Sequence, residues 1–101
     1  MILLHVIAES KKDAEFLVRF LIKEKFLFSG HIHPITEYES SSGMPQPKWE
    51  LTGRTKALLF QNIKQALQSN DIGKHLPIYA TPIVYLDEDQ SEIIRNHTLK
   101  T

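Results

Sequence analysis

Two stretches of this chain, residues 2–7 and 77–86, are apolar at both odd and even positions. Successive side chains of a strand point to opposite faces, so such a pattern is typical of a strand that is buried on both faces. Both stretches are rich in β-branched and aromatic residues and are shorter than an ordinary helix, which favours strands. The chain must therefore fold so that its first and last strands are covered on two sides.

A helix is predicted after the first strand, over residues 11–25. Ser10 can cap its first turn, and Asp13 stands at the reciprocal position of a capping box. One apolar stripe recurs at helical spacing for contact with a core, at Ala14, Leu17, Val18, Leu21 and Ile22.

A hairpin is predicted next, from an extended stretch over residues 31–40 and a third strand over 49–54. Residues 40–47 hold most of the turn-forming residues of this region and predict the connection. Pro34 lies within the first arm, and because proline cannot donate to a ladder, that arm should be an edge strand or carry a bulge.

A second helix is predicted from the spacing of Leu59, Ile63, Ala66 and Leu67. Its start is open, since residues 56–60 can instead prolong the third strand. Gly73 closes this region, and Asp87 can cap a short final helix.

The resulting order, strand-helix-strand-strand-helix-strand, predicts one α+β domain over residues 1–101 with a ferredoxin-like βαββαβ sandwich. Two helices pack on one face of a four-stranded antiparallel sheet, and a short C-terminal helix follows. Right-handed crossovers make the first strand a neighbour of both the third and the fourth and leave the second at an edge.

Composition excludes several classes of function. The chain has 12 basic and 12 acidic residues and so no net charge, which disfavours nucleic acid and membrane surfaces as partners. It has no cysteine, so neither a disulfide nor a thiolate metal site can form. The apolar start lacks a basic segment and is too short to span a bilayer, and we expect a cytoplasmic location.

Self-association is expected because the helices can cover only one face of the sheet, while the first and fourth strands are apolar on both. A contiguous apolar patch of several hundred Å² is unusual on a monomer. The uncovered face should therefore meet another copy of the chain. The alternative is that the final helix folds over it.

A metal site is the sharpest local hypothesis. His31 and His33 alternate along a strand and point the same way, so both imidazoles can bind one ion, although a stable site needs a third ligand, which another subunit would supply. His5 lies in an apolar strand and is expected at an interface.

A ligand cleft between subunits is the second hypothesis, with Tyr38, Trp49, Arg54 and Lys56 as candidates. Arg54 and Lys56 share a parity and can hold an anion. No phosphate loop or catalytic motif is recognisable, so we expect no enzymatic activity. An acylphosphatase would need a Gly-Arg loop after the first strand, where residues 8–10 read Ala-Glu-Ser.

Several motifs resemble those of the CutA family. Residues 29–32 (Ser-Gly-His-Ile) stand at the place of a Cys-Val-Asn-Ile run, so that Ser29 replaces the cysteine, and residues 36–38 (Thr-Glu-Tyr) stand at that of a Ser-x-Tyr. Glu50 with Lys56 is similar to the Glu and Lys of the family's third strand.

The last strand extends the resemblance over nearly the whole chain. Residues 76–77 (Leu-Pro) with Pro82 are similar to a Val-Pro-x-Ile-x-x-x-Pro run, and residues 74–76 stand where the family has His-Pro-Tyr-Glu. The resemblance implies a non-enzymatic homotrimer linked to tolerance of divalent cations, with copper as the candidate metal. The alternatives are a PII-like sensor that binds a nucleotide or other small ligand between subunits, and a structural interaction module.

Overall fold

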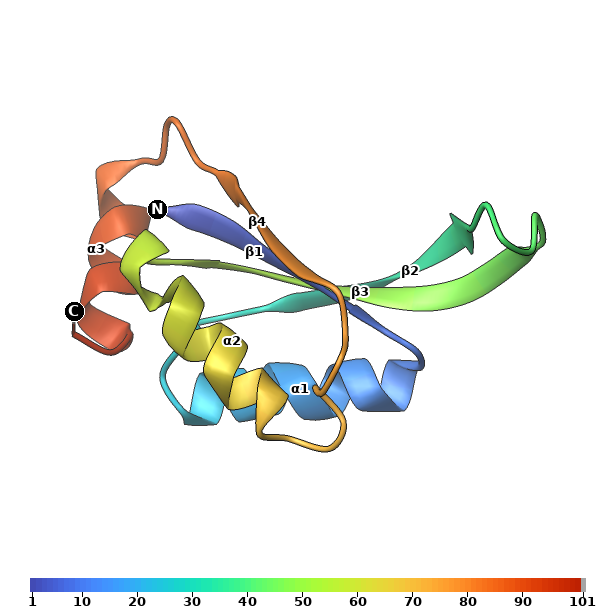
Figure 1. Ribbon diagram of the computed structural model, residues 1–101. Coiled ribbons are helices and arrows are strands. Elements are labelled where there is room, and N and C mark those ends of the chain that lie inside the picture. Colours follow the sequence, from blue (N-terminus) through green and yellow to red (C-terminus); the bar gives the residue numbers. More distant parts are fainter. Residues whose placement is uncertain (101) are drawn as a thin grey trace.

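The predicted strands form one antiparallel sheet in the order β2-β3-β1-β4 (Figure 1). The structure, a computed structural model, describes residues 1–100. The strands are β1 (Ile2–Ala8), β2 (His31–Tyr38), β3 (Pro45–Thr55) and β4 (Ile78–Pro82). This order confirms the predicted neighbours of β1 and the edge position of β2, the strand that contains Pro34.

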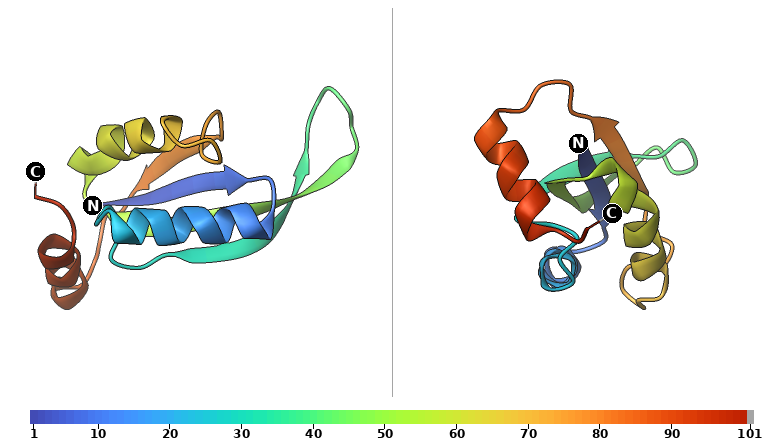
Figure 2. Two further views of the ribbon diagram at one scale, coloured as in Figure 1. Left: turned by 90° about the horizontal axis from the view of Figure 1, so that it is seen from below. Right: turned by 90° about the vertical axis from the view of Figure 1, so that its left-hand side faces the viewer.

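The helices are α1 (Lys11–Lys23), the short 3-10 helix η1 (Ala57–Leu59), α2 (Phe60–Gln68) and α3 (Glu88–His97). Both α1 and α2 lie on one side of the sheet, as the ferredoxin-like sandwich requires (Figures 1 and 2). The ten-residue α3 lies at one end of the sheet, where Leu99 N donates to the carbonyl of Lys25 at 2.9 Å.

The core fills the space between the sheet and the helices α1 and α2. Its fully buried side chains come from the strand positions that face the helices and from the inner stripes of α1 and α2, and include Leu4, Val6, Ala8, Leu17, Leu21, Leu51 and Ile63. One glycine packs closely here, because a Cβ on Gly53 would lie 2.8 Å from both methyl carbons of buried Leu27.

The predicted caps at Ser10 and Asp87 are confirmed. Ser10 Oγ accepts a hydrogen bond from the Asp13 amide at 3.1 Å, and Asp87 Oδ1 accepts one from the Gln90 amide at 3.0 Å. The first helix ends at Lys23 rather than at residue 25, because Lys25 adopts the left-handed conformation with φ of 61°.

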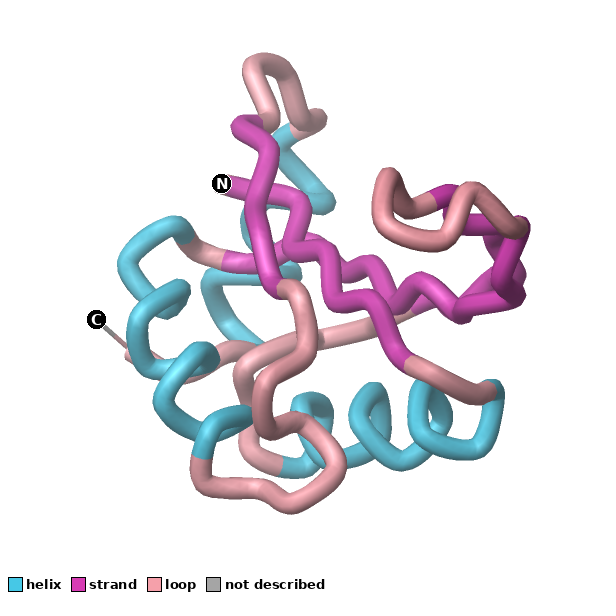
Figure 3. The backbone as a smooth tube through the Cα atoms, turned by 45° about the vertical axis from the view of Figure 1, so that its right-hand side comes forward, coloured by secondary structure: helices cyan, strands magenta, loops and turns pink. Residues whose placement is uncertain are grey.

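The predicted hairpin loop is too long. Residues 45–47 belong to β3 and pair with residues 36–38, so the chain between the strands is only residues 39–44. β1 ends at Ala8, which pairs with Trp49, so the other side of residues 45–48 has no β1 partner. Pro45 and Pro47 are tolerated there as at any sheet edge. This end of the hairpin extends beyond the body of the sheet (Figure 3).

The predicted fourth strand is also too long, since β4 ends at Pro82 rather than at residue 86. Pro82 pairs with Ile2, the first residue of β1, and past that point the neighbouring strand has ended. Val84 and Tyr85 are consequently 78% and 92% exposed. The open boundary of the second helix is settled at η1, directly after β3.

Candidate functional site

The sheet has an open face, opposite the face that α1 and α2 cover. Cross-strand partners point the same way, so the register assigns its members. They are Leu3, His5 and Ile7 of β1, His31, His33, Ile35 and Glu37 of β2, Gln46, Lys48, Glu50, Thr52 and Arg54 of β3, and Tyr79 and Thr81 of β4. The predicted alternative, in which the final helix covers this face, is wrong, because α3 packs at the end of the sheet (Figure 2).

A polar cluster occupies the middle of the open face, and Glu50 is at its centre. We name it the Glu50 cluster: Glu50, His5, His33, Tyr79 and Thr81. Glu50 Oε1 lies 2.9 Å from His33 Nε2, and Glu50 Oε2 accepts a hydrogen bond from the Tyr79 hydroxyl at 3.2 Å. The Glu50 side chain is only 15% exposed, so these contacts replace most of its hydration.

His5 joins the cluster from the neighbouring strand. Its ring stacks on Tyr79 with centroids 4.4 Å apart, and Nε2 lies 3.2 Å from Thr81 Oγ1. Nδ1 is buried and faces Glu50 Oε2 at 3.5 Å, without a hydrogen-bond partner among residues 1–100. A buried nitrogen without a partner costs free energy, and this one is directed at the carboxylate.

The pKa of the Tyr79 phenol is raised above its ordinary value of 10.0. Burial of the hydroxyl is the largest cause, followed by the charge of Glu50 and the hydrogen bond between the two groups. Each of these disfavours the phenolate. The cluster therefore keeps Tyr79 as a hydrogen-bond donor.

A second polar group lies on the same face toward the hairpin. Lys48 Nζ is 2.6 Å from Glu9 Oε2 and 3.9 Å from Glu37 Oε2. The hydrogen bond with Glu9 is the main reason that the pKa of Lys48 is raised above 10.5. This ion pair fixes a lysine, otherwise mobile, against the sheet.

Both histidines of the predicted metal pair lie on the open face, as expected, but His33 contacts Glu50, while His31 is opposite Thr52. In the part of the chain that the structure describes, no three His, Asp or Glu side chains are grouped so that they could hold a metal ion. One chain thus supplies two imidazoles and no third ligand, and the metal site stays a prediction.

The four cleft candidates do not come together within one chain. Tyr38 is 69% exposed at the end of β2. Trp49 lies on the covered face, with the Lys11 ammonium 5.6 Å from its ring centre. Arg54 is on the open face, whereas Lys56 follows β3 and donates to the Leu99 carbonyl at 2.8 Å. Within one chain the ammonium of Lys56 is thus engaged by the C-terminal segment, and an anion site shared by Arg54 and Lys56 between subunits stays a prediction.

The cluster itself was not predicted. The sequence analysis names Glu50 only as part of the family resemblance, and it predicts His5 only as an interface residue. The signal that could have found it is the register, which brings His5 opposite Tyr79 and His33 opposite Glu50. That register depends on long-range pairing and cannot be read from local periodicity.

Comparison with known proteins finds no matching family model and no matching curated sequence. Solved structures do match. CutA1 from Pyrococcus horikoshii is 17% identical with a TM-score of 0.85, covering 99% of this chain and 100% of its own. CutA1 from Oryza sativa is 21% identical with a TM-score of 0.87, covering 99% and 94%.

The chain has the CutA1 fold. The periplasmic divalent cation tolerance protein CutA from Archaeoglobus fulgidus shares it as well, at 18% identity and a TM-score of 0.85, over 96% of this chain and 98% of its own. The resemblance predicted from short motifs is thus confirmed in the fold. No helix within residues 1–100 is long and apolar enough to cross a membrane.

Proposed function

We propose that this chain is a divergent CutA-type protein, a non-enzymatic homotrimer that acts in the cellular response to divalent cations such as copper, in the cytoplasm. The observation that supports it is the CutA1 fold over essentially the full length of the chain, combined with a sheet face that α1, α2 and α3 all leave uncovered.

Self-association follows from the character of that face. Its centre is the Glu50 cluster, in which the side chains of Glu50 and His5 are only 15% and 13% exposed although no helix of residues 1–100 lies over them. Leu3 and Ile7 flank His5 along β1 and are half-buried. A face with half-buried apolar residues around a partly buried polar centre has the composition of a protein interface.

The oligomeric state tests this proposal. Sedimentation equilibrium at micromolar concentration should give three times the mass of the chain. Ile7→Asp should produce a monomer, since it would bury an unpaired charge in the interface. The matched control is Ile22→Asp on α1, where the side chain is 40% exposed and the trimer should persist. A wild-type protein that sediments as a monomer would contradict the proposal.

The cation role needs a separate measurement. A trimer can bring histidines of several subunits together and so supply the ligands that one chain lacks. Calorimetric titration with copper and zinc should show binding to the wild type that the double variant His31→Ala/His33→Ala loses. The control is His75→Asn. The backbone of His75 is left-handed, and asparagine tolerates that conformation. Equal titration of the double variant and the wild type would remove these two histidines from the proposal.

A further inference from the structure

A groove of about 580 Å³ runs along the outer side of α1. Its lining comes from this helix alone and consists of Lys12, Glu15, Phe16, Arg19, Phe20 and Lys23. The buried residues of the helix, Ala14, Leu17 and Leu21, lie on its other side, against the core. Figure 2 shows no other element of residues 1–100 over the outer side of α1. We name this surface the α1 groove, and it is open in the folded chain.

Two aromatic rings form the apolar part of the α1 groove. Phe16 and Phe20 are one helical turn apart, and their ring planes are within 5° of parallel with centroids 6.5 Å apart. Phe20 also packs against the hydrophobic core, whereas Phe16 is 44% exposed. The core thus holds one ring in place, and the other can contact a partner. Aromatic residues are enriched in protein interfaces relative to the rest of the surface.

Three cations lie along the same side of the helix, at Lys12, Arg19 and Lys23, and they span about 16 Å at a rise of about 1.5 Å per residue. Arg19 and Lys23 are one turn apart, a spacing at which like charges destabilise a helix. None of the ion pairs formed within residues 1–100 involves these three cations. Glu15 is the one acidic residue among the described lining residues, so the α1 groove has a net positive charge.

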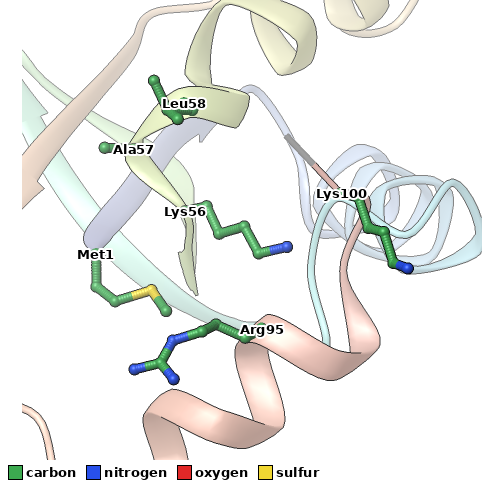
Figure 4. A pocket seen from close by; sticks show the side chains of 6 residues that line it. All are labelled: Met1, Lys56, Ala57, Leu58, Arg95 and Lys100. Carbon is green, nitrogen blue, oxygen red and sulfur yellow. The ribbon is translucent and has the colours of Figure 1, made fainter.

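The pocket of about 520 Å³ at the end of the sheet lacks this combination. Figure 4 shows the Lys56 ammonium and the Arg95 guanidinium pointing in opposite directions there, and no aromatic ring of residues 1–100 lines it. In the α1 groove the cations share one side of one helix with two rings. Positive charge and exposed aromatic surface thus occur together in the α1 groove and not in this pocket.

We propose that the α1 groove binds an acidic amphipathic peptide segment of a partner protein, in which carboxylates flank bulky apolar side chains. The apolar side chains contact Phe16 and Phe20, as in other complexes where an amphipathic helix lies in a groove. Each cation meets a separate carboxylate along the peptide, so the charged ends of the three side chains need not converge. The opposite charges of the two surfaces give the complex its specificity.

A membrane surface fits the α1 groove less well. A helix that lies in a membrane surface buries a whole apolar face in the lipid. The apolar face of α1 is already buried in the core, and only two rings remain outside. The proposal does not depend on self-association, because α1 and the open face lie on opposite sides of the sheet (Figure 2). The α1 groove therefore stays accessible in the proposed trimer.

Fluorescence anisotropy with a labelled model peptide tests the site. The probe is a three-turn peptide in which Leu recurs at every third or fourth position between Glu residues, and its matched twin has Gln in place of every Glu. The Glu peptide should bind the wild type saturably, with an affinity that falls as salt is added. The Gln peptide should bind about tenfold more weakly, because three exposed ion pairs are lost.

Variants of the protein locate the site. Phe16→Ala should weaken binding of the Glu peptide about tenfold, since it removes the exposed aromatic contact. The matched control is Ile22→Ala on the same helix, which is 40% exposed outside the α1 groove and should stay within about twofold of the wild type. Arg19→Gln should weaken binding about threefold, whereas Arg95→Gln on α3 should leave it unchanged.

Circular dichroism checks that each variant is folded, and alanine is compatible with the helix at both positions. The proposal is overturned if the Glu peptide does not bind saturably, if the Glu and Gln peptides bind equally, or if Phe16→Ala and Ile22→Ala weaken binding alike. A wild-type protein that binds vesicles of anionic phospholipid but not the Glu peptide would also overturn it and assign this side of α1 to a membrane surface.

Discussion

The two faces of the sheet are built from the same four strands, yet they differ in kind. The covered face is apolar and dry, with Leu4, Val6 and Leu51 fully buried beneath the helices. The open face has the Glu50 cluster at its centre, where a carboxylate contacts two imidazoles and a phenol. Odd and even positions of one strand thus contribute to different parts of the molecule, the Glu50 cluster and the core.

The difference separates folding from function in this molecule. Burial of apolar surface on the covered face stabilises the fold and tolerates little change of volume. The open face contributes polar contacts whose net effect on folding is small, because they replace contacts with water. Substitutions on the two faces should therefore differ both in size and in what they change.

The largest effect is expected on the covered face. Leu51→Ala should lower the free energy of unfolding by about 2–5 kcal/mol, since it leaves a cavity under the helices. Its neighbour in sequence, Thr52, points to the open face. Thr52→Ala should therefore change the free energy of unfolding by no more than about 0.5 kcal/mol. Urea denaturation at several protein concentrations separates folding from association. Similar costs at the two positions would invalidate the contrast between the faces.

A smaller loss of stability is expected at Gly53, where the covered face has little room for a larger side chain. Gly53→Ala would bring a Cβ within 2.8 Å of the buried Leu27 methyl carbons and should cost about 1–3 kcal/mol through overpacking. Gly43→Asn is the control, because Gly43 has a left-handed φ of 67° that asparagine tolerates, with no atom within 4 Å of the new Cβ. A stable Gly53→Ala protein would show that Leu27 can move.

The smallest change in stability is expected from the open face, where the informative quantity is the Tyr79 pKa. Glu50→Gln should lower that pKa toward 10.0 without reaching it, because burial, the larger cause, remains. Ultraviolet titration in a Tyr38→Phe/Tyr85→Phe background isolates Tyr79. Glu37→Gln, on the same face but in contact with Lys48, should leave the pKa unchanged. An unaltered Tyr79 pKa in Glu50→Gln would contradict the described contacts.

The same shift fixes the sign of a pH dependence. Because folding raises the Tyr79 pKa, the contribution of the protonated phenol to stability is complete below its ordinary value of 10.0. It is lost as pH rises through the higher folded value. Glu50→Gln should narrow the pH range between the ordinary pKa of Tyr79 and its higher folded value. Urea denaturation at several pH values across this range would detect the change.

Much of the fold could be predicted because it depends on local patterns. Ser10 and Asp87 cap helices through contacts only three residues away. Pro34 marks an edge strand because proline has no N–H to donate to a second neighbouring strand. The wrong predictions concern strand ends, which depend on pairing with a strand that is distant in sequence. Pro45 and Pro47 join β3 because β1 ends before it reaches them, and β4 stops at Pro82 because β1 begins at Ile2.

The sequence by itself determined the order of the elements and the ferredoxin-like sandwich. These follow from periodicity, which each segment carries alone. Only the tertiary structure decided which polar groups meet. Glu50 meets His5 and Tyr79 through strand register, and Lys56 meets the carbonyl of Leu99 because α3 packs at the end of the sheet. Such contacts join residues far apart in sequence, and the closure of the whole chain determines them.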